Sequence, residues 1–262
     1  MKIKFIVSYD GTDYCGWQRQ NHGSKLGISQ VITEAIEKVL NEKINLFASG
    51  RTDAGVHALN QVCHFVTTKD LSPKPHKAWD FCWAVNAHLP PAIVLKKAWI
   101  APDEFHATIS PTHKTYRYFI LNRFRASPFL TRNADWVRKP IDINYLNECC
   151  QYIVGNHDFK SFQSVGTPVP HTVREVMKAE WTYRRPHLLQ FSITGEGFLK
   201  QMVRNIVGTQ LFLWKKGLKP SEMAEILKKM DRKMAGPPAP PQGLFLYKVY
   251  YPQDLDKQCL EI

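Results

Sequence analysis

The order of strand-like and helix-like segments is the feature that most narrows the fold of this chain. Hydrophobic side chains alternate along residues 2–9, which predicts a half-buried strand, and they recur at helical spacing along residues 29–41, which predicts a helix. The same patterns predict further strands at 44–49, 61–67, 93–100, 114–121, 173–183, 187–194 and 244–251, and further helices at 76–88, 142–154, 198–214 and 222–230. Because helices do not alternate regularly with strands, an all-parallel sheet is disfavoured and an α+β fold with mixed or antiparallel sheets is predicted.

The second half of the chain restarts the strand–helix–strand theme of the first, although no repeat is visible residue by residue. The irregular segment APDEFHATISPTH, at 101–113, interrupts the pattern. We therefore predict two related α+β halves, residues 1–105 and residues 106–262. Ser29 and Ser221 stand where the N-caps of two helices are expected.

The charge balance points to a polyanionic partner. The 262 residues include 35 Lys and Arg against 23 Asp and Glu, a formal net charge of +12. Such an excess favours nucleic acid as the partner, with a generally basic, solvated surface as the alternative. The N-terminus MKIKFIVSYD lacks the apolar core of a signal peptide and no long apolar run occurs, so a cytoplasmic protein without a membrane span is predicted.

Several common kinds of active site are disfavoured by the absence of their motifs. The six cysteines form no CxxC pair and fit no zinc spacing, which favours reduced structural thiols. The sequence has no GxGxxG or P-loop for a nucleotide cofactor and no GxSxG elbow for a serine hydrolase. We therefore expect no cofactor and no metal.

The segment GRTDAGVHA, at 50–58, is the first candidate site. An extended backbone places Arg51 and Asp53 on the same side, and a neighbouring cation favours the ionised carboxylate. Asp53 is therefore a candidate nucleophile, with a turn aspartate that bonds its own backbone as the alternative. A nuclease metal site built from Asp10, Asp13, Asp53 and His57 is disfavoured, because their spacing matches no ligand pattern.

The predicted helix at 198–214 and the strand at 114–121 add further candidates. Lys200 and Arg204 lie on the polar side of the helix near its N-terminus, where the helix dipole disfavours cations. This placement predicts a nearby anion, with a solvated helix face as the alternative. Tyr116 and Tyr118 share one strand face, which predicts either core packing or a ring that stacks on an unpaired base.

Six segments carry a family resemblance, and they occur in the order YDGTDYCGWQRQ, GRTDAGVHA, EFHATISPTHKTYRYFI, GNHDFKSF, GFLKQMVRNIVG and APPQGLFLYKVYY. Together they resemble the TruA-type tRNA pseudouridine synthases over about residues 3–251. The resemblance implies conversion of uridine to pseudouridine at positions 38 to 40 of the tRNA anticodon stem-loop. It also implies a homodimer without metal or organic cofactor, and two α+β halves whose antiparallel sheets meet at a central basic cleft.

The resemblance assigns roles to individual residues. It implies that Asp53 is the nucleophile, Arg51 assists displacement of the target base, Tyr116 stacks on the target uracil and Arg204 pairs with Asp53. It also predicts RNA contacts by Tyr116, Phe105, His106, Arg174, Lys200 and Leu246. Two residues depart from the pattern, since Thr108 replaces a basic residue and Asn60 replaces a common glycine.

The chemistry of the predicted reaction suits a single carboxylate. Uridine isomerisation breaks the bond between ribose C1′ and uracil N1 and rejoins the base through C5, and a carboxylate adduct at C6 or C1′ can hold the pieces together. The target nucleotide must leave its stack. The attacked carbon stays open, as does the C5 proton acceptor, for which Tyr116 and Asp53 are candidates. The competing hypothesis is a non-catalytic tRNA-binding protein in which Asp53 is incidental.

Overall fold

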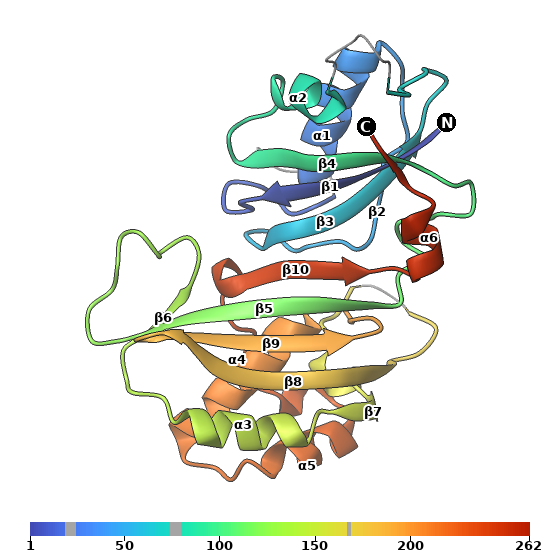
Figure 1. The fold of residues 1–262 in the computed structure, drawn as a ribbon. Coiled ribbons are helices and arrows are strands. Elements are labelled where there is room, and N and C mark those ends of the chain that lie inside the picture. The colour runs from blue at the N-terminus through green and yellow to red at the C-terminus, as the bar shows by residue number, and fades with distance from the viewer. Residues whose placement is uncertain (19–24, 74–79, 167–168) are drawn as a thin grey trace. The chain divides into compact units, whose positions relative to one another are not determined.

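The computed structural model describes four stretches of the chain, which are residues 1–18, 25–73, 80–166 and 169–262 (Figure 1). The chain forms two compact units, here called unit 1 (residues 1–112 and 246–262) and unit 2 (residues 113–245). The prediction that residues 1–105 and 106–262 are separate domains stays a prediction. Within the described stretches, no helix has both the length and the apolar composition that crossing a membrane requires.

The sheet of unit 1 is antiparallel and built around its first strand. The strand β1 (Lys2–Tyr9) lies between β3 (His57–Val66) and β4 (Ile93–Ala101), with Phe5 opposite both Cys63 and Ala98. Three further strands complete the sheet, namely β2 (Phe47–Ala48) on β3, β11 (Leu260–Glu261) on β4 and β10 (Leu244–Tyr250) alongside β3. The short helix α6 (Gln253–Lys257) connects β10 to β11.

Two helices cover one face of this sheet, α1 (Ile28–Leu40) and α2 (Phe81–Asn86) (Figure 1). The alternation along β1 directs Ile3, Phe5 and Val7 to this covered face, where all three are fully buried. The facing residues of α1 recur every four positions, and Ile28, Ile32 and Ile36 are likewise fully buried. The predicted strand 2–9 and helix 29–41 are therefore confirmed to within one residue at each end.

Three details of unit 1 differ from prediction. Gly27, not Ser29, is the N-cap of α1, because its carbonyl accepts the first helical hydrogen bonds, from the amides of Gln30 and Val31. The predicted strand at 44–49 shrinks to β2, which has two residues. The helix predicted at 76–88 spans only Phe81–Asn86 where it is described, and residues 74–79 lie outside the described stretches.

The sheet of unit 2 is mixed. Its antiparallel strands run in the order β5 (His113–Asn122), β9 (Leu188–Gly195), β8 (Val173–Arg185) and β7 (Gly155–Asp158), and β6 (Asp135–Val137) pairs with β5 in parallel. Three helices pack with it, α3 (Ile143–Gln151), α4 (Met202–Lys216) and α5 (Glu222–Lys229). The fully buried rings of Tyr118, Phe159, Phe162 and Phe191 belong to its core. The predicted α+β class with mixed and antiparallel sheets is confirmed.

The helix α4 begins later than predicted and is more deeply buried. Gln201 has a left-handed backbone (φ 59°) and serves as N-cap, so Phe198 and Lys200 precede the helix instead of forming its first turn. Arg204 is only 9% exposed and Asn205 is fully buried, so the solvated face considered for this helix is wrong at these positions. The sequence Lys215, Lys216 and Gly217 is typical of a helix C-terminus, and the structure agrees, because Gly217 ends the helix in a left-handed conformation after Lys216.

Two smaller expectations have clear outcomes. Ser221 is the N-cap of α5, as predicted, but its side chain makes no capping hydrogen bond. All six cysteines are free thiols. Burial raises the pKa of both Cys149 and Cys150 to about 12, which keeps these thiols protonated.

Candidate active site

The loop that carries Asp53 connects β2 to β3 in unit 1. Thr52 is buried, and its Oγ1 lies 2.8 Å from the hydroxyl of Tyr9. The flanking residues are more accessible, with Arg51 exposed and Asp53 half-buried. The carbonyl of Asp53 accepts a hydrogen bond from the amide of Val56 (3.1 Å), which closes a tight turn. This alternation of burial agrees with the predicted extended backbone around Asp53.

A second loop, residues 10–17, supports the first through backbone contacts. The amide of Trp17 donates to the carbonyl of Thr52 (3.0 Å). A Cβ on Gly11 would lie 2.0 Å from the carbonyl oxygen of Val56, and a Cβ on Gly16 would lie 2.7 Å from that of Thr52. Because such approaches leave no room for a side chain, the two glycines let the loops pack backbone against backbone and fix the path of the chain through Asp53.

Substituting Gly16 by alanine tests this support. Gly16 combines a positive φ of 105° with the close approach to Thr52, so we expect Gly16→Ala to lower the free energy of unfolding by about 3 kcal/mol and to lower activity. Gly217→Ala is the matched control, since φ there is 66° but nothing lies within 4 Å of the added Cβ. Equal losses in urea unfolding for both variants would contradict a role for the loop contact.

The histidine of the motif also holds the loops together. Nδ1 of His57 accepts a hydrogen bond from the amide of Gly11 (3.1 Å), and Oδ1 of Asp10 lies 3.2 Å from the same nitrogen. Asp10 in turn accepts from both the amide and the hydroxyl of Thr12. Across the described stretches of the chain, no group of three or more His, Cys, Asp or Glu side chains is arranged to hold a metal ion. These contacts favour a positioning role for Asp10 and His57.

Tyr116 lies on β5 of unit 2, opposite Ile193 of β9. Its ring is 9% exposed and meets the ring of Phe198 edge-on, with 5.1 Å between centroids. Tyr118, in contrast, is fully buried and donates its hydroxyl to the carbonyl of Pro240 (2.9 Å), so it belongs to the core. The sequence prediction missed Phe198 as a neighbour of Tyr116, because it began the helix at this residue, whereas the helix begins at Met202.

The basic candidates of unit 2 are held by backbone carbonyls. Arg204 donates from Nε to the carbonyl of Ala239 (2.8 Å), and Lys200 donates from Nζ to the carbonyl of Val165 (3.0 Å). Arg174 donates to the carbonyls of His171 and Val173. A Cβ on Gly197 would lie 3.7 Å from Nε of Arg174, so Arg174 lies beside the residue that precedes Phe198. Backbone carbonyls thus fix all three basic side chains within unit 2.

The remaining predicted RNA-binding residues lie in unit 1, and the structure places them at different depths. Phe105 and Leu246 are fully buried, whereas the half-buried ring of His106 meets that of His64 edge-on at 4.6 Å. Phe105 packs on His64 and Tyr251. Direct RNA contacts by these residues stay predictions.

The two departures from the family pattern have structural roles in unit 1. The hydroxyl of Thr108 donates to the carbonyl of Ala48 (2.7 Å). Asn60 donates to the carbonyl of Tyr247 (2.6 Å) and accepts from Nζ of Lys96 (2.8 Å). Both side chains therefore tie neighbouring backbone segments together at positions where the family more often has a basic residue or a glycine.

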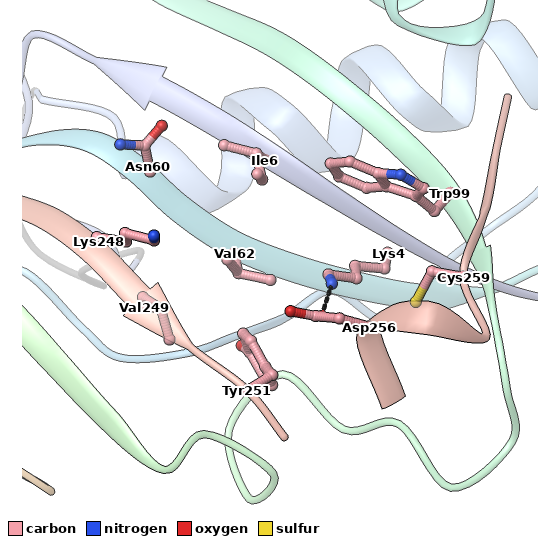
Figure 2. A pocket seen from close by; sticks show the side chains of 10 residues that line it. All are labelled: Lys4, Ile6, Asn60, Val62, Trp99, Lys248, Val249, Tyr251, Asp256 and Cys259. Carbon is pink, nitrogen blue, oxygen red and sulfur yellow. Dashed lines mark hydrogen bonds and ion pairs between the residues drawn. The ribbon is translucent and has the colours of Figure 1, made fainter. Parts of the chain in front are cut away.

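Unit 1 contains a hollow of about 380 Å³ (Figure 2), and no residue of the Asp53 loop lines it. Figure 2 shows Lys4 inside it, paired with Asp256 at 2.6 Å and near Trp99. Nζ of Lys4 also lies 5.1–5.3 Å from the ring centroids of Trp99, Phe105 and Tyr251. The ion pair and the aromatic rings together account for a lysine that is only 7% exposed. None of the predicted catalytic residues lines this hollow.

Comparisons with known proteins identify the family. The sequence profile of the tRNA pseudouridine synthases matches this chain twice, over residues 5–108 and 149–252, so the two halves are related. A tRNA pseudouridine synthase A from Bdellovibrio bacteriovorus is 66% identical, covering 100% of this chain and 99% of the relative. Proteins of the same name from Ruminiclostridium cellulolyticum and Syntrophotalea carbinolica are 37% and 39% identical, covering 95% and 99% of this chain and 99% and 98% of the relatives. The chain therefore belongs to the tRNA pseudouridine synthase family and is a pseudouridine synthase, an isomerase.

Proposed function

We propose that this enzyme converts uridine to pseudouridine at positions 38 to 40 of the tRNA anticodon stem-loop, with Asp53 as its nucleophile. The observation that carries the assignment of Asp53 is the construction of its loop. Two glycine-dependent backbone contacts, at Gly11 and Gly16, hold one half-buried carboxylate beside the exposed Arg51. A nucleophile must meet one particular carbon atom, and a fixed chain path through Asp53 meets that need.

The reaction assigns a task to each catalytic residue. The Asp53 carboxylate forms a covalent bond to C6 of the base or to C1′ of the ribose, the C1′–N1 bond breaks, and the base turns and rejoins ribose through C5. The bond to Asp53 breaks and regenerates the carboxylate, the proton at C5 leaves and N1 gains one, so that the product is an isomer of the substrate. Arg51 assists displacement of the base, Tyr116 stacks on the uracil and Arg204 pairs with the Asp53 carboxylate.

The proposed catalytic residues are carried by both units, with Asp53 in unit 1 and Tyr116 and Arg204 in unit 2. The net charge of +12 supports binding of tRNA through lysine and arginine contacts with phosphates. His106, Arg174 and Lys200 are the proposed RNA contacts, whereas the predicted contacts Phe105 and Leu246 are fully buried in unit 1. We further propose a cytoplasmic homodimer that needs no cofactor.

The test uses wild-type protein, unmodified transcribed tRNA and a metal chelator, with pseudouridine mapped at each nucleotide. The proposed function predicts new pseudouridine at one or more of positions 38 to 40 and undiminished activity in chelator. Pseudouridine elsewhere in the tRNA would reject the proposed position. Tight, salt-sensitive tRNA binding without pseudouridine would favour the non-catalytic RNA-binding alternative for these substrates.

A further inference from the structure

The proline-rich segment AGPPAPPQG, at 235–243, lies directly against the first turns of α4 within unit 2. We propose that this segment, here called the proline loop, is a positioning element that fixes the guanidinium of Arg204 for catalysis. The inference rests on the proposed function, because it takes Arg204 as the partner of the Asp53 carboxylate. The part of the fold that orients the Arg204 side chain is then the proline loop.

The proline loop holds both the backbone and the side chain of Arg204. The amide of Ala239 donates to the carbonyl of Arg204 (2.9 Å), and Nε of Arg204 donates to the carbonyl of Ala239 (2.8 Å). The two residues therefore form a reciprocal pair of hydrogen bonds. Because a guanidinium is planar, fixing its Nε–H direction also fixes the direction in which its two Nη groups point.

The proline loop also packs closely on α4 one turn after Arg204, at Gly208. A Cβ on Gly208 would lie 1.9 Å from the carbonyl oxygen of Pro237 and 2.8 Å from the amide nitrogen of Ala239. The next residue, Thr209, is fully buried, and its hydroxyl accepts a hydrogen bond from the amide of Gly236 (3.0 Å). Only a helix position without a side chain lets the loop approach closely enough to reach Arg204.

The far end of the proline loop is anchored on the sheet. The hydroxyl of Tyr118, on β5, donates to the carbonyl of Pro240 (2.9 Å), and a Cβ on Gly243 would lie 2.5 Å from the Tyr118 ring. Prolines further restrict the loop backbone, since each fixes its own φ. The loop is therefore tied at Gly236 and Pro240, on either side of the carbonyl that holds Arg204.

A second set of contacts fixes the helix itself beside Arg204. The fully buried Asn205 donates to the carbonyl of Phe162 (2.7 Å) and accepts from Nη2 of Arg232 (3.0 Å). These bonds set the rotation of α4 about its axis. With the helix backbone fixed in this way, the conformation of the proline loop decides where the Arg204 side chain points.

The test compares Thr209→Val with Thr209→Ser in single-turnover kinetics. Valine keeps the shape of threonine but leaves the Gly236 amide without its acceptor, whereas serine keeps the hydroxyl. We expect Thr209→Val to lower the catalytic rate by about 10-fold with little change in the Kd for tRNA, and Thr209→Ser to stay within about twofold of wild type. Tyr118→Phe, which loosens the loop at its other anchor, is expected to act in the same direction and serves if Thr209→Val does not fold.

Combining the loop variants with Arg204→Lys separates positioning from general stability. Arg204→Lys keeps the positive charge but lacks the guanidinium Nε, and we expect it to lower the rate by about 100-fold. If the loop acts through Arg204, Thr209→Val or Tyr118→Phe adds no further loss in the Arg204→Lys background. The same loss in both backgrounds, or no loss in the wild-type background, would overturn the inference while the proposed function stands. Absence of pseudouridine from the wild-type protein would reject the proposed function itself.

Discussion

Replacing Asp53 by asparagine is expected to lower pseudouridine formation by at least about 10³-fold, because an amide oxygen is a far poorer nucleophile than a carboxylate. Asparagine has nearly the same shape, and the turn at this position is closed by the backbone carbonyl of Asp53, which the substitution leaves in place. Binding of tRNA is expected to stay within about threefold of wild type, since phosphate contacts dominate affinity.

The decisive measurement is pseudouridine mapped per nucleotide beside tRNA affinity at fixed salt. Asp103→Asn is the matched control, because Asp103 is exposed in unit 1 and its loss changes the net charge by the same amount. We expect Asp103→Asn to behave as wild type in both assays. Full activity of Asp53→Asn would reject Asp53 as the nucleophile. Equal losses of activity in both variants would indicate that the change in net charge, and not the loss of a nucleophile, lowers the rate.

The parts of the fold that the sequence predicts well are those with a long, regular hydrophobic pattern. The strand β1 and the helix α1 have such patterns, and their predicted bounds agree with the structure. The N-terminus of α4 could not be predicted, because its position depends on the left-handed backbone of Gln201, a non-glycine residue that gives no signal in the sequence. Short elements such as β6 and β7 were missed because three or four residues carry too little periodicity.

The candidate site shows the same division between local and tertiary information. The Asp53 loop could be predicted from one contiguous motif, GRTDAGVHA, whereas its support by Gly11 and Gly16 comes from a second loop and could not. The reciprocal bonds between Arg204 and Ala239 join residues 35 positions apart, and no local pattern indicates that pairing. The edge-on contact of Phe198 with Tyr116 likewise depends on how β5 and β9 pair.

Acid is expected to destabilise unit 1 through His64, a 2% exposed residue of β3. Its Nδ1 accepts a hydrogen bond from the amide of Ala107 (3.1 Å), and the ring of Phe47 stacks on it at 4.9 Å. Burial, with smaller contributions from His106 and Lys2, lowers the pKa of His64 from 6.5 to about 4. Protonation would place a hydrogen on Nδ1 against the Ala107 amide, so the neutral form is the one that fits the fold.

The sign of the effect follows from proton binding. Between pH 6.5 and about 4 the unfolded chain holds a proton at this histidine and the folded protein does not, so stability is lost as the pH falls through this range. A shift from 6.5 to about 4 corresponds to a loss of up to about 3 kcal/mol.

Urea unfolding of wild type and His64→Asn from pH 7 to pH 4.5 measures this effect. The asparagine oxygen can accept from the Ala107 amide but does not titrate, so we expect the variant to lose less stability over this range than wild type. His88→Asn, at an exposed histidine, is expected to retain the wild-type dependence. If His64→Asn and wild type lose stability in parallel, acid acts elsewhere in the chain, and His64 does not make folding of unit 1 sensitive to pH.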